Sequence, residues 1–275
     1  MAHAILGGIP HYLLQFDPNR SIEENVKACI LRSGSALYSE PEFLMRQEFR
    51  ETAIYNSIVQ AVALGATQLN EISQKTMLEA SRLSPYLRNL IEVGILEREF
   101  PVGIGLQERT KARRGLYRIC DNFFRFWYAF VFSNASALDA HDIEGVWRNI
   151  VCPTLNHFAA APFEDICKAW LWRQNAQGKL PFYCTEIGRW WNGGEVDVMA
   201  VDAGMRHALI GECKFKNSPV GFDVLKKLQQ KDNDLKPPVE GYYLFSRSGF
   251  TSGLREQASS LSGVHLIPCD RLYKQ

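Results

Sequence analysis

The chain has 275 residues and a formal net charge of +1, with 46% hydrophobic and 22% charged residues. This balance is ordinary for a globular protein and does not mark the whole chain as a nucleic-acid binder, so any basic surface must be local. The seven cysteines form no CxxC pair, which argues against a zinc site, and the apolar runs are too short and too polar to span a bilayer. There is no signal-peptide pattern, and we expect a cytoplasmic protein.

The first fifty residues are predicted to be helical. Ser21 is followed three residues later by Glu24, a spacing that predicts a capping box at the start of a helix. Neither this segment nor the rest of the chain contains a GxxxxGK[ST] loop. The sequence therefore gives no support for nucleotide binding by this chain.

Residues 51–120 have the outline of a winged helix-turn-helix. We predict one helix that ends at Gly65, a short helix around Ile72, and a third that starts at Ser84-Pro85 and ends at Gly94. Two strands around a polar loop follow, at 95–100 and 116–119. A helix, a short helix, a helix and two strands are the elements of a winged helix, in that order.

The third helix of this module would expose a polar face to DNA, and the loop between the two strands is basic. The candidate nucleic-acid contacts on the helix are Arg82, Tyr86, Arg88 and Asn89, and those on the loop are Arg109, Lys111, Arg113 and Arg114. Basic loops are often only solvated, and winged helices also pair proteins. DNA contact and protein docking therefore both remain open.

The remainder of the chain is predicted to contain an aromatic helical connector at 121–152 and an α/β domain at 153–275. The aromatic residues of the connector are too dense for a single stripe, and we interpret them as core. The α/β domain is predicted to contain a helix from Phe163, a strand that begins at Phe182, a helix at 222–230, and further strands at 242–245 and 264–267. Lys226, Lys227 and Lys231 would face either solvent or a DNA backbone.

Two apolar runs in this domain carry charged residues. Residues 194–199 contain Asp197, residues 211–215 contain Glu212 and Lys214, and the turn signal at 202–204 lies between the runs. Period-two alternation in a hairpin puts Glu212 and Lys214 on one face, and Asp197 can point to that face too. Two carboxylates and a lysine suit a magnesium-dependent phosphodiesterase, although a structural ion-pair network at a sheet edge is the alternative.

The order of these residues resembles a known superfamily. A helix with Glu164, a strand with Asp197, a strand with Glu212-Cys213-Lys214 and a helix with Gln229 resemble the PD-(D/E)xK nucleases. The sequence motifs at 189–191, 195–197 and 211–214 are similar to those of the branch of this superfamily at the C-terminus of archaeal-type AAA ATPases, a domain of otherwise unknown function. Residues 7–13 resemble the end of the ATPase module, and 42–44 its link to the winged helix.

This resemblance implies a fold class and four regions. The chain would combine an N-terminal helical segment and a winged helix-turn-helix with a restriction-endonuclease-like mixed sheet flanked by helices, and would lack the ATPase core. The implied regions are a helical remnant of the ATPase module at 1–50, the winged helix at 51–120, the connector at 121–152 and the nuclease-like domain at 153–275.

The resemblance also implies roles for individual residues. Mg²⁺ or Mn²⁺ would be bound by Asp197, Glu212, Glu164 and the main-chain carbonyl of Cys213. Period-two alternation along the strand also puts Glu195 with Asp197, which makes Glu195 a candidate auxiliary ligand. Lys214 would orient the attacking water or offset developing charge, and Gln229 would hold the scissile phosphate. A glycine-led segment precedes Asp197 where the superfamily's name has a proline.

The resulting hypothesis is a DNA-binding endonuclease that acts on double-stranded DNA. The rival is a non-catalytic DNA-binding or protein-docking module that regulates an AAA-type ATPase, and a homo-oligomer is a further possible assembly. The sequence contains no feature that would place the protein at a membrane.

Overall fold

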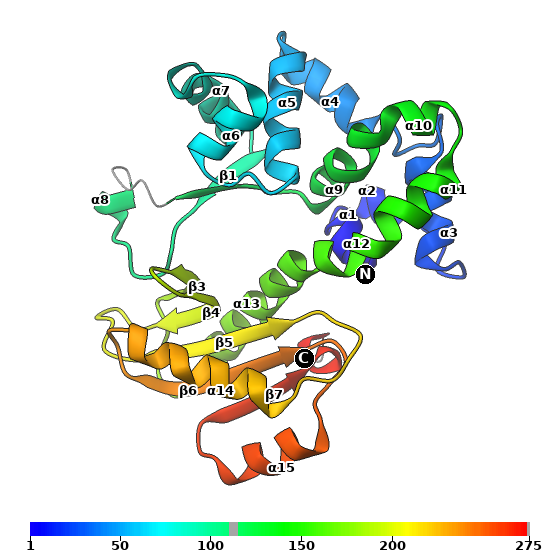
Figure 1. Cartoon of the computed structure of the whole chain (residues 1–275). Coiled ribbons are helices and arrows are strands. Elements are labelled where there is room, and N and C mark those ends of the chain that lie inside the picture. The colour runs from blue at the N-terminus through cyan, green and yellow to red at the C-terminus, as the bar shows by residue number, and fades with distance from the viewer. Residues whose placement is uncertain (110–114, 274–275) are drawn as a thin grey trace. The chain divides into compact units, whose positions relative to one another are not determined.

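The computed structural model describes residues 1–109 and 115–273, which divide into two compact units (Figure 1). The first unit holds Met1–Glu99 and Gly115–Leu155, and the second holds Phe100–Arg114 and Asn156–Gln275. Helices make up most of the first unit, and a five-stranded mixed sheet lies in the second, which confirms the predicted mixed α/β class. Among the described helices, none combines the length and the apolar character that a membrane crossing needs.

The first fifty residues are helical, as predicted. The capping box is present, because Ser21 Oγ accepts the Glu24 N–H at 3.2 Å while Glu24 Oε2 accepts the Ser21 N–H at 2.8 Å. The elements here are α1 (Ala2–Leu6), α2 (Pro10–Leu13), α3 (Ile22–Val26), the π-helical turn η1 (Lys27–Leu31) and α4 (Glu40–Glu48).

Three helices and a two-stranded antiparallel sheet come next. They are α5 (Thr52–Ala63), α6 (Leu69–Thr76), α7 (Ala80–Glu92), β1 (Leu96–Glu99) and β2 (Leu116–Ile119). The predicted start of the third helix was wrong, because α7 begins at Ala80, and Pro85 lies inside it. Starting earlier buries Leu83 completely, which offsets the one helix hydrogen bond that Pro85 cannot donate.

Residues 101–109, predicted to start a polar loop between the two strands, belong to the second unit. The Val102 N–H donates to the Arg189 carbonyl at 2.9 Å, and the Val102 side chain is buried in the same core as Trp190. The short helix α8 (Leu106–Arg109) follows. Lys111, Arg113 and Arg114, the other basic residues predicted for this loop, lie outside the described residues.

The aromatic segment is helical and packs into the core of the first unit, as interpreted from sequence. Phe123, Phe126 and Tyr128 are fully buried, and the Tyr128 hydroxyl donates to Asn56 Oδ1 at 2.7 Å. The elements from here to the second unit are α9 (Asn122–Phe126), η2 (Trp127–Val131), η3 (Phe132–Asn134), α10 (Ala135–Asp139), α11 (Ile143–Val146), η4 (Trp147–Val151) and α12 (Cys152–Phe158).

The sheet of the second unit has the order β3-β4-β5-β6-β7. β4 pairs antiparallel with both β3 and β5, whereas the β5–β6 and β6–β7 pairs are parallel. The strands are β3 (Glu186–Trp191), β4 (Glu195–Val201), β5 (Ala208–Lys214), β6 (Val239–Ser246) and β7 (Val264–Pro268). The predicted hairpin between β4 and β5 is confirmed, and Asp202 closes its turn by accepting the Arg206 N–H at 2.6 Å.

Helices cover both faces of this sheet (Figure 1). Phe163, Cys167 and Leu171 of α13 pack on one face, while the apolar stripe of α14 and Leu254 of α15 pack on the other. The helices are α13 (Ala160–Ala176), α14 (Phe222–Gln230), η5 (Lys231–Asp234), α15 (Ser252–Ser260) and η6 (Cys269–Tyr273).

Two predicted boundaries in this unit were wrong. The helix that carries Glu164 begins at Ala160, not at Phe163, so this acid lies in the second turn. The first strand begins at Glu186, not at Phe182, because the backbone of Cys184 is held by a side chain instead of by a neighbouring strand. Asn175 Nδ2 donates to the Cys184 carbonyl at 2.9 Å, and Asn175 Oδ1 accepts the Cys184 N–H at 2.8 Å.

We expect Asn175→Ala to lower the free energy of unfolding by about 2–4 kcal/mol, because it leaves two buried backbone groups of Cys184 without partners. Urea denaturation of the parent and the variant measures this loss. The matched control is Gln177→Ala, at an exposed position just after the same helix, which should change stability by less than about 0.5 kcal/mol. A change as small as that in Asn175→Ala would contradict the assignment.

Candidate metal and phosphodiester site

Strand β4 carries a bulge where the predicted acid lies. Its pairing with β3 shifts between Gly188 and Trp190, so that Asp197 and Val198 together lie opposite a single β3 residue. A bulge bends the strand and re-aims its side chains. The Asp197 carboxylate points to β5, where Oδ2 accepts the N–H of Cys213 at 2.8 Å.

Glu212 is held by two lysines. Its side chain is 13% exposed; Oε1 accepts a hydrogen bond from Lys214 Nζ, and Oε2 accepts one from Lys231 Nζ at 2.7 Å. Burial alone would raise the pKa of Glu212, but the hydrogen bonds from Lys214 and Lys231 outweigh it and leave this pKa below its ordinary value. Burial alone would lower the pKa of Lys214, but Glu212 and Asp197 outweigh that effect and raise it. Glu212 is therefore ionised and Lys214 is charged.

The other two acids are less well compensated. Burial and the charge of Glu212 raise the pKa of Asp197. Glu164, on α13, is 20% exposed, and burial together with the charge of Asp197 raises its pKa to about 8. The carboxylates on α13 and β5 are thus each coupled electrostatically to Asp197 on β4. Such shifts are common where residues are arranged for chemistry, although structural networks also produce them.

Arg189 of β3 forms ion pairs with two acids, Glu164 and Glu195. Its Nε lies 3.7 Å from Glu164 Oε2, and its other end binds Glu195 Oε1. The guanidinium also lies 5.6 Å from the ring centre of Trp191. Glu195 is 57% exposed, and its carboxylate is bound by the Arg189 guanidinium. Its role as an auxiliary ligand stays a prediction.

The other predicted residues are more dispersed. Gln229 is half-buried near the end of α14, two residues before Lys231, and Cys213 contacts Asp197 through its N–H. Arg109 forms an ion pair with Glu186 at 2.5 Å within the second unit, so its guanidinium already has an acidic partner.

The predicted DNA contacts on α7 lie in the first unit. Arg82, Arg88 and Asn89 occupy its outer side, with both arginines exposed. Asn89 Nδ2 donates to the Tyr55 hydroxyl at 2.7 Å, and the Tyr86 hydroxyl donates to Glu51 Oε2 at 2.8 Å. The two arginines are therefore better placed than Tyr86 for contact with a phosphate backbone.

The donor atoms at the sheet meet the needs of some divalent metals and not of others. Within residues 1–109 and 115–273, no three His, Cys, Asp or Glu side chains are grouped to hold an ion. Mg²⁺, however, keeps several waters and needs only one or two protein carboxylates together with substrate phosphate oxygens. Asp197 and Glu212 are hard oxygen donors with mutually repelling charges, so their chemistry fits Mg²⁺ or Mn²⁺.

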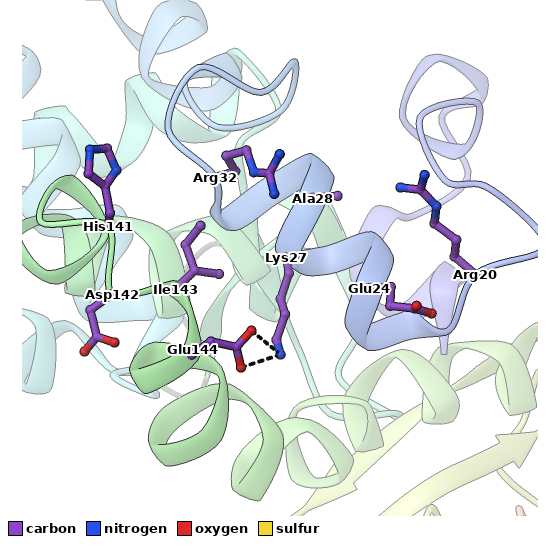
Figure 2. A pocket seen from close by; sticks show the side chains of 9 residues that line it. All are labelled: Arg20, Glu24, Lys27, Ala28, Arg32, His141, Asp142, Ile143 and Glu144. Atoms are coloured by element: carbon purple, nitrogen blue, oxygen red, sulfur yellow. Dashed lines mark hydrogen bonds and ion pairs between the residues drawn. The ribbon is translucent and has the colours of Figure 1, made fainter.

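A cavity of about 600 Å³ lies elsewhere, within the first unit (Figure 2). Lys27 reaches from one wall to Glu144 on the other, with 2.7 Å between Nζ and Oε2. Arg32 lies on the wall of Lys27, and His141 on that of Glu144. None of the predicted catalytic or metal-binding residues lines this cavity. The metal site predicted at the sheet is therefore separate from this cavity and is inferred from the arrangement of its side chains.

Comparisons with known proteins find similarity to an uncharacterised protein family and to an uncharacterised relative. A family model of archaeal and bacterial proteins of unknown function, DUF234, matches residues 127–232. This range covers Glu164, Asp197, Glu212, Lys214 and Lys231. An uncharacterized protein of Methanocaldococcus jannaschii, MJECL04, is 36% identical over 213 residues, which are 76% of this chain and 46% of that protein. The chain thus spans less than half the length of this curated relative.

One solved structure was also matched, an O-methyltransferase from neocarzinostatin biosynthesis in complex with S-adenosyl-L-homocysteine. The match covers 85% of this chain and 67% of that chain, at 13% sequence identity and a TM-score of 0.20. A TM-score this low carries no argument about fold or function.

Two residues at the site had no predicted role in it. Arg189 belongs to a motif that carries the family resemblance, and Lys231 is one of three lysines in one short segment. A basic residue followed by two tryptophans on a strand is a weak signal for Arg189. For Lys231, no local pattern indicates that a residue beyond α14 returns to a β5 carboxylate.

We expect Glu164→Gln to stabilise the chain at high pH. The pKa of this carboxyl is raised from 4.5 to about 8 in the folded protein, so the stability that the protonated form provides is present below pH 4.5 and lost as the pH rises through 8. The variant should be more stable than the parent by about 2 kcal/mol or more at pH 9 and no more stable at pH 4. Urea denaturation at both pH values measures the difference.

The control for this comparison is Glu256→Gln, at an exposed position on α15, which should keep the pH dependence of the parent. Equal stability of the parent and Glu164→Gln at pH 9 would show that folding does not raise the pKa of Glu164.

Proposed function

We propose that this chain is a metal-dependent phosphodiesterase that cleaves the backbone of double-stranded DNA, with a restriction-endonuclease-like second unit and a winged helix in the first. The single observation that supports it is the approach of Asp197 to Glu212-Cys213-Lys214 on two antiparallel strands, with the bulge aiming the aspartate. A buried cluster of carboxylates is unfavourable for stability, and a bound divalent cation would remove that cost.

In this proposal Asp197 and Glu212 hold Mg²⁺ or Mn²⁺, and the bound cation would favour the ionised form of Glu164, whose pKa is raised to about 8 without it. The metal would supply Lewis-acid polarisation of the phosphate and a more acidic water. Lys214, kept charged by Glu212 and Asp197, lies where it can offset negative charge that develops on the phosphate. Gln229 would donate hydrogen bonds to a phosphate oxygen, and the Cys213 N–H fixes the orientation of the Asp197 carboxylate.

The catalytic proposal is tested with the purified chain, duplex DNA and Mg²⁺ or Mn²⁺. Asp197→Asn and Lys214→Met should each lower the cleavage rate by about a hundredfold or more, because each removes a group that acts on the reacting phosphate or its metal. The exposed Glu256→Gln serves as the control and should cleave at the parental rate. If the parent cuts nothing with either metal, or both variants cut as fast as the parent, the catalytic proposal is wrong.

A specific observation favours a second candidate. Both oxygens of Glu212 are already occupied by lysines, as they would be in a structural ion-pair network. The chain would then be a non-catalytic DNA-binding or protein-docking module that regulates an AAA-type ATPase, either in a longer protein or as a separate partner. This candidate predicts DNA or protein binding that is indifferent to divalent metal and unchanged in Asp197→Asn.

In both candidates Arg82 and Arg88 on α7 would contact DNA phosphates. Replacing both by Gln should weaken duplex binding and reduce the slope of log Kobs against log salt by about 0.9 for each phosphate that is no longer neutralised. Arg46→Gln on α4 removes the same kind of charge from an exposed i,i+4 pair with Glu42 and should leave the slope unchanged. Fluorescence anisotropy across a salt series measures it, and an unchanged slope in the double variant would exclude α7 from the interface.

A further inference from the structure

Lys231 is a second cation on a carboxylate that already has one. Lys214 lies two residues beyond Glu212 on the same strand, whereas Lys231 comes from η5, after the whole of α14. Lys231 Nζ lies 2.7 Å from Glu212 Oε2, the oxygen that Lys214 leaves available. One carboxylate charge therefore faces two ammonium charges from two independent elements.

Both Glu212 oxygens, which a metal ion would need as ligands, already accept hydrogen bonds from lysines. A carboxylate oxygen has two lone pairs, but a divalent cation and an ammonium group on the same oxygen lie close together and repel each other, which favours loss of the hydrogen bond. The charge of Lys231 also acts on Asp197, where it partly opposes the rise in pKa that burial and Glu212 cause. The ammonium group thus offsets both predicted metal ligands.

We propose that Lys231 is a placeholder cation: it occupies Glu212 Oε2 in the metal-free protein and must leave this oxygen when a divalent metal binds. The inference rests on the proposed metal-dependent function and adds a residue to it. The placeholder keeps Glu212 ordered and ionised in the absence of metal. It does so at the expense of metal affinity, because a divalent ion and the ammonium compete for one oxygen and repel each other.

The position of Lys231 suits such an exchange. Its side chain is partly exposed, at 27%, and sits on a flexible four-carbon stem at the junction of α14 and η5. The released ammonium would remain next to the site with its charge unpaired. A phosphate group of the nucleic-acid backbone is the natural new partner, so metal binding would also prepare a substrate contact.

The test is the affinity of the full chain for Mn²⁺ alone, measured without DNA by titration with electron paramagnetic resonance of the free ion. Lys231→Gln should bind Mn²⁺ about tenfold more tightly than the parent, because the competing charge is gone. Lys231→Arg keeps the charge and should bind no more tightly than the parent. Lys227→Gln removes the same charge from α14 without removing a partner of Glu212, and should change the affinity by less than about twofold.

The outcomes separate this inference from the proposed function. If the parent binds Mn²⁺ and Asp197→Asn does not, but Lys231→Gln binds no more tightly than the parent, the placeholder role is overturned and the metal site stands. If neither the parent nor Lys231→Gln binds Mn²⁺, both fail. Thermal unfolding without metal checks that Lys231→Gln is folded. If it is unfolded, Lys231→Met replaces it: tighter Mn²⁺ binding by that variant supports the placeholder role, and unchanged binding overturns it.

Discussion

The second unit depends on how it accommodates three carboxylates in a poorly solvated part of its sheet. Asp197, Glu212 and Glu164 come from three elements, and burial together with the charge of a neighbouring acid raises the pKa values of Asp197 and Glu164. Basic residues nearby reduce this repulsion, among them Lys214 and Lys231 at Glu212 and Arg189 at Glu164. Burying like charges does not stabilise a fold, and this cost is the reason for proposing a metal site here.

The scaffold around this cluster is built to hold it in place. α13 brings Glu164 to the sheet through an apolar face on Phe163, Cys167 and Leu171, and Asn175 of the same helix ties down the backbone that enters β3. On the other face, α14 leads directly into the element that carries Lys231. The three acids are thus carried by α13, β4 and β5, each of which also has buried side chains.

Local patterns predicted much of this arrangement. The Ser21 capping box, the turn at Asp202 and the common side of Glu212 and Lys214 follow from spacing over a few residues, and all three are found. The parts that could not be predicted depend on distant contacts. The bulge at Asp197 is a register shift between strands, and Lys231 reaches Glu212 only after an intervening helix. Val102 joins the sheet core from a segment that local composition marks as loop.

The central claim is that the acids at β4 and β5 form a metal site and not merely an ion-pair network. Anomalous diffraction from crystals of the full chain soaked in Mn²⁺ tests it most directly. The account predicts one anomalous peak within coordination distance of the Asp197 and Glu212 carboxylates, with Lys231 displaced from Glu212. A fully soaked crystal with no peak there, and with both lysines still on Glu212, would contradict it.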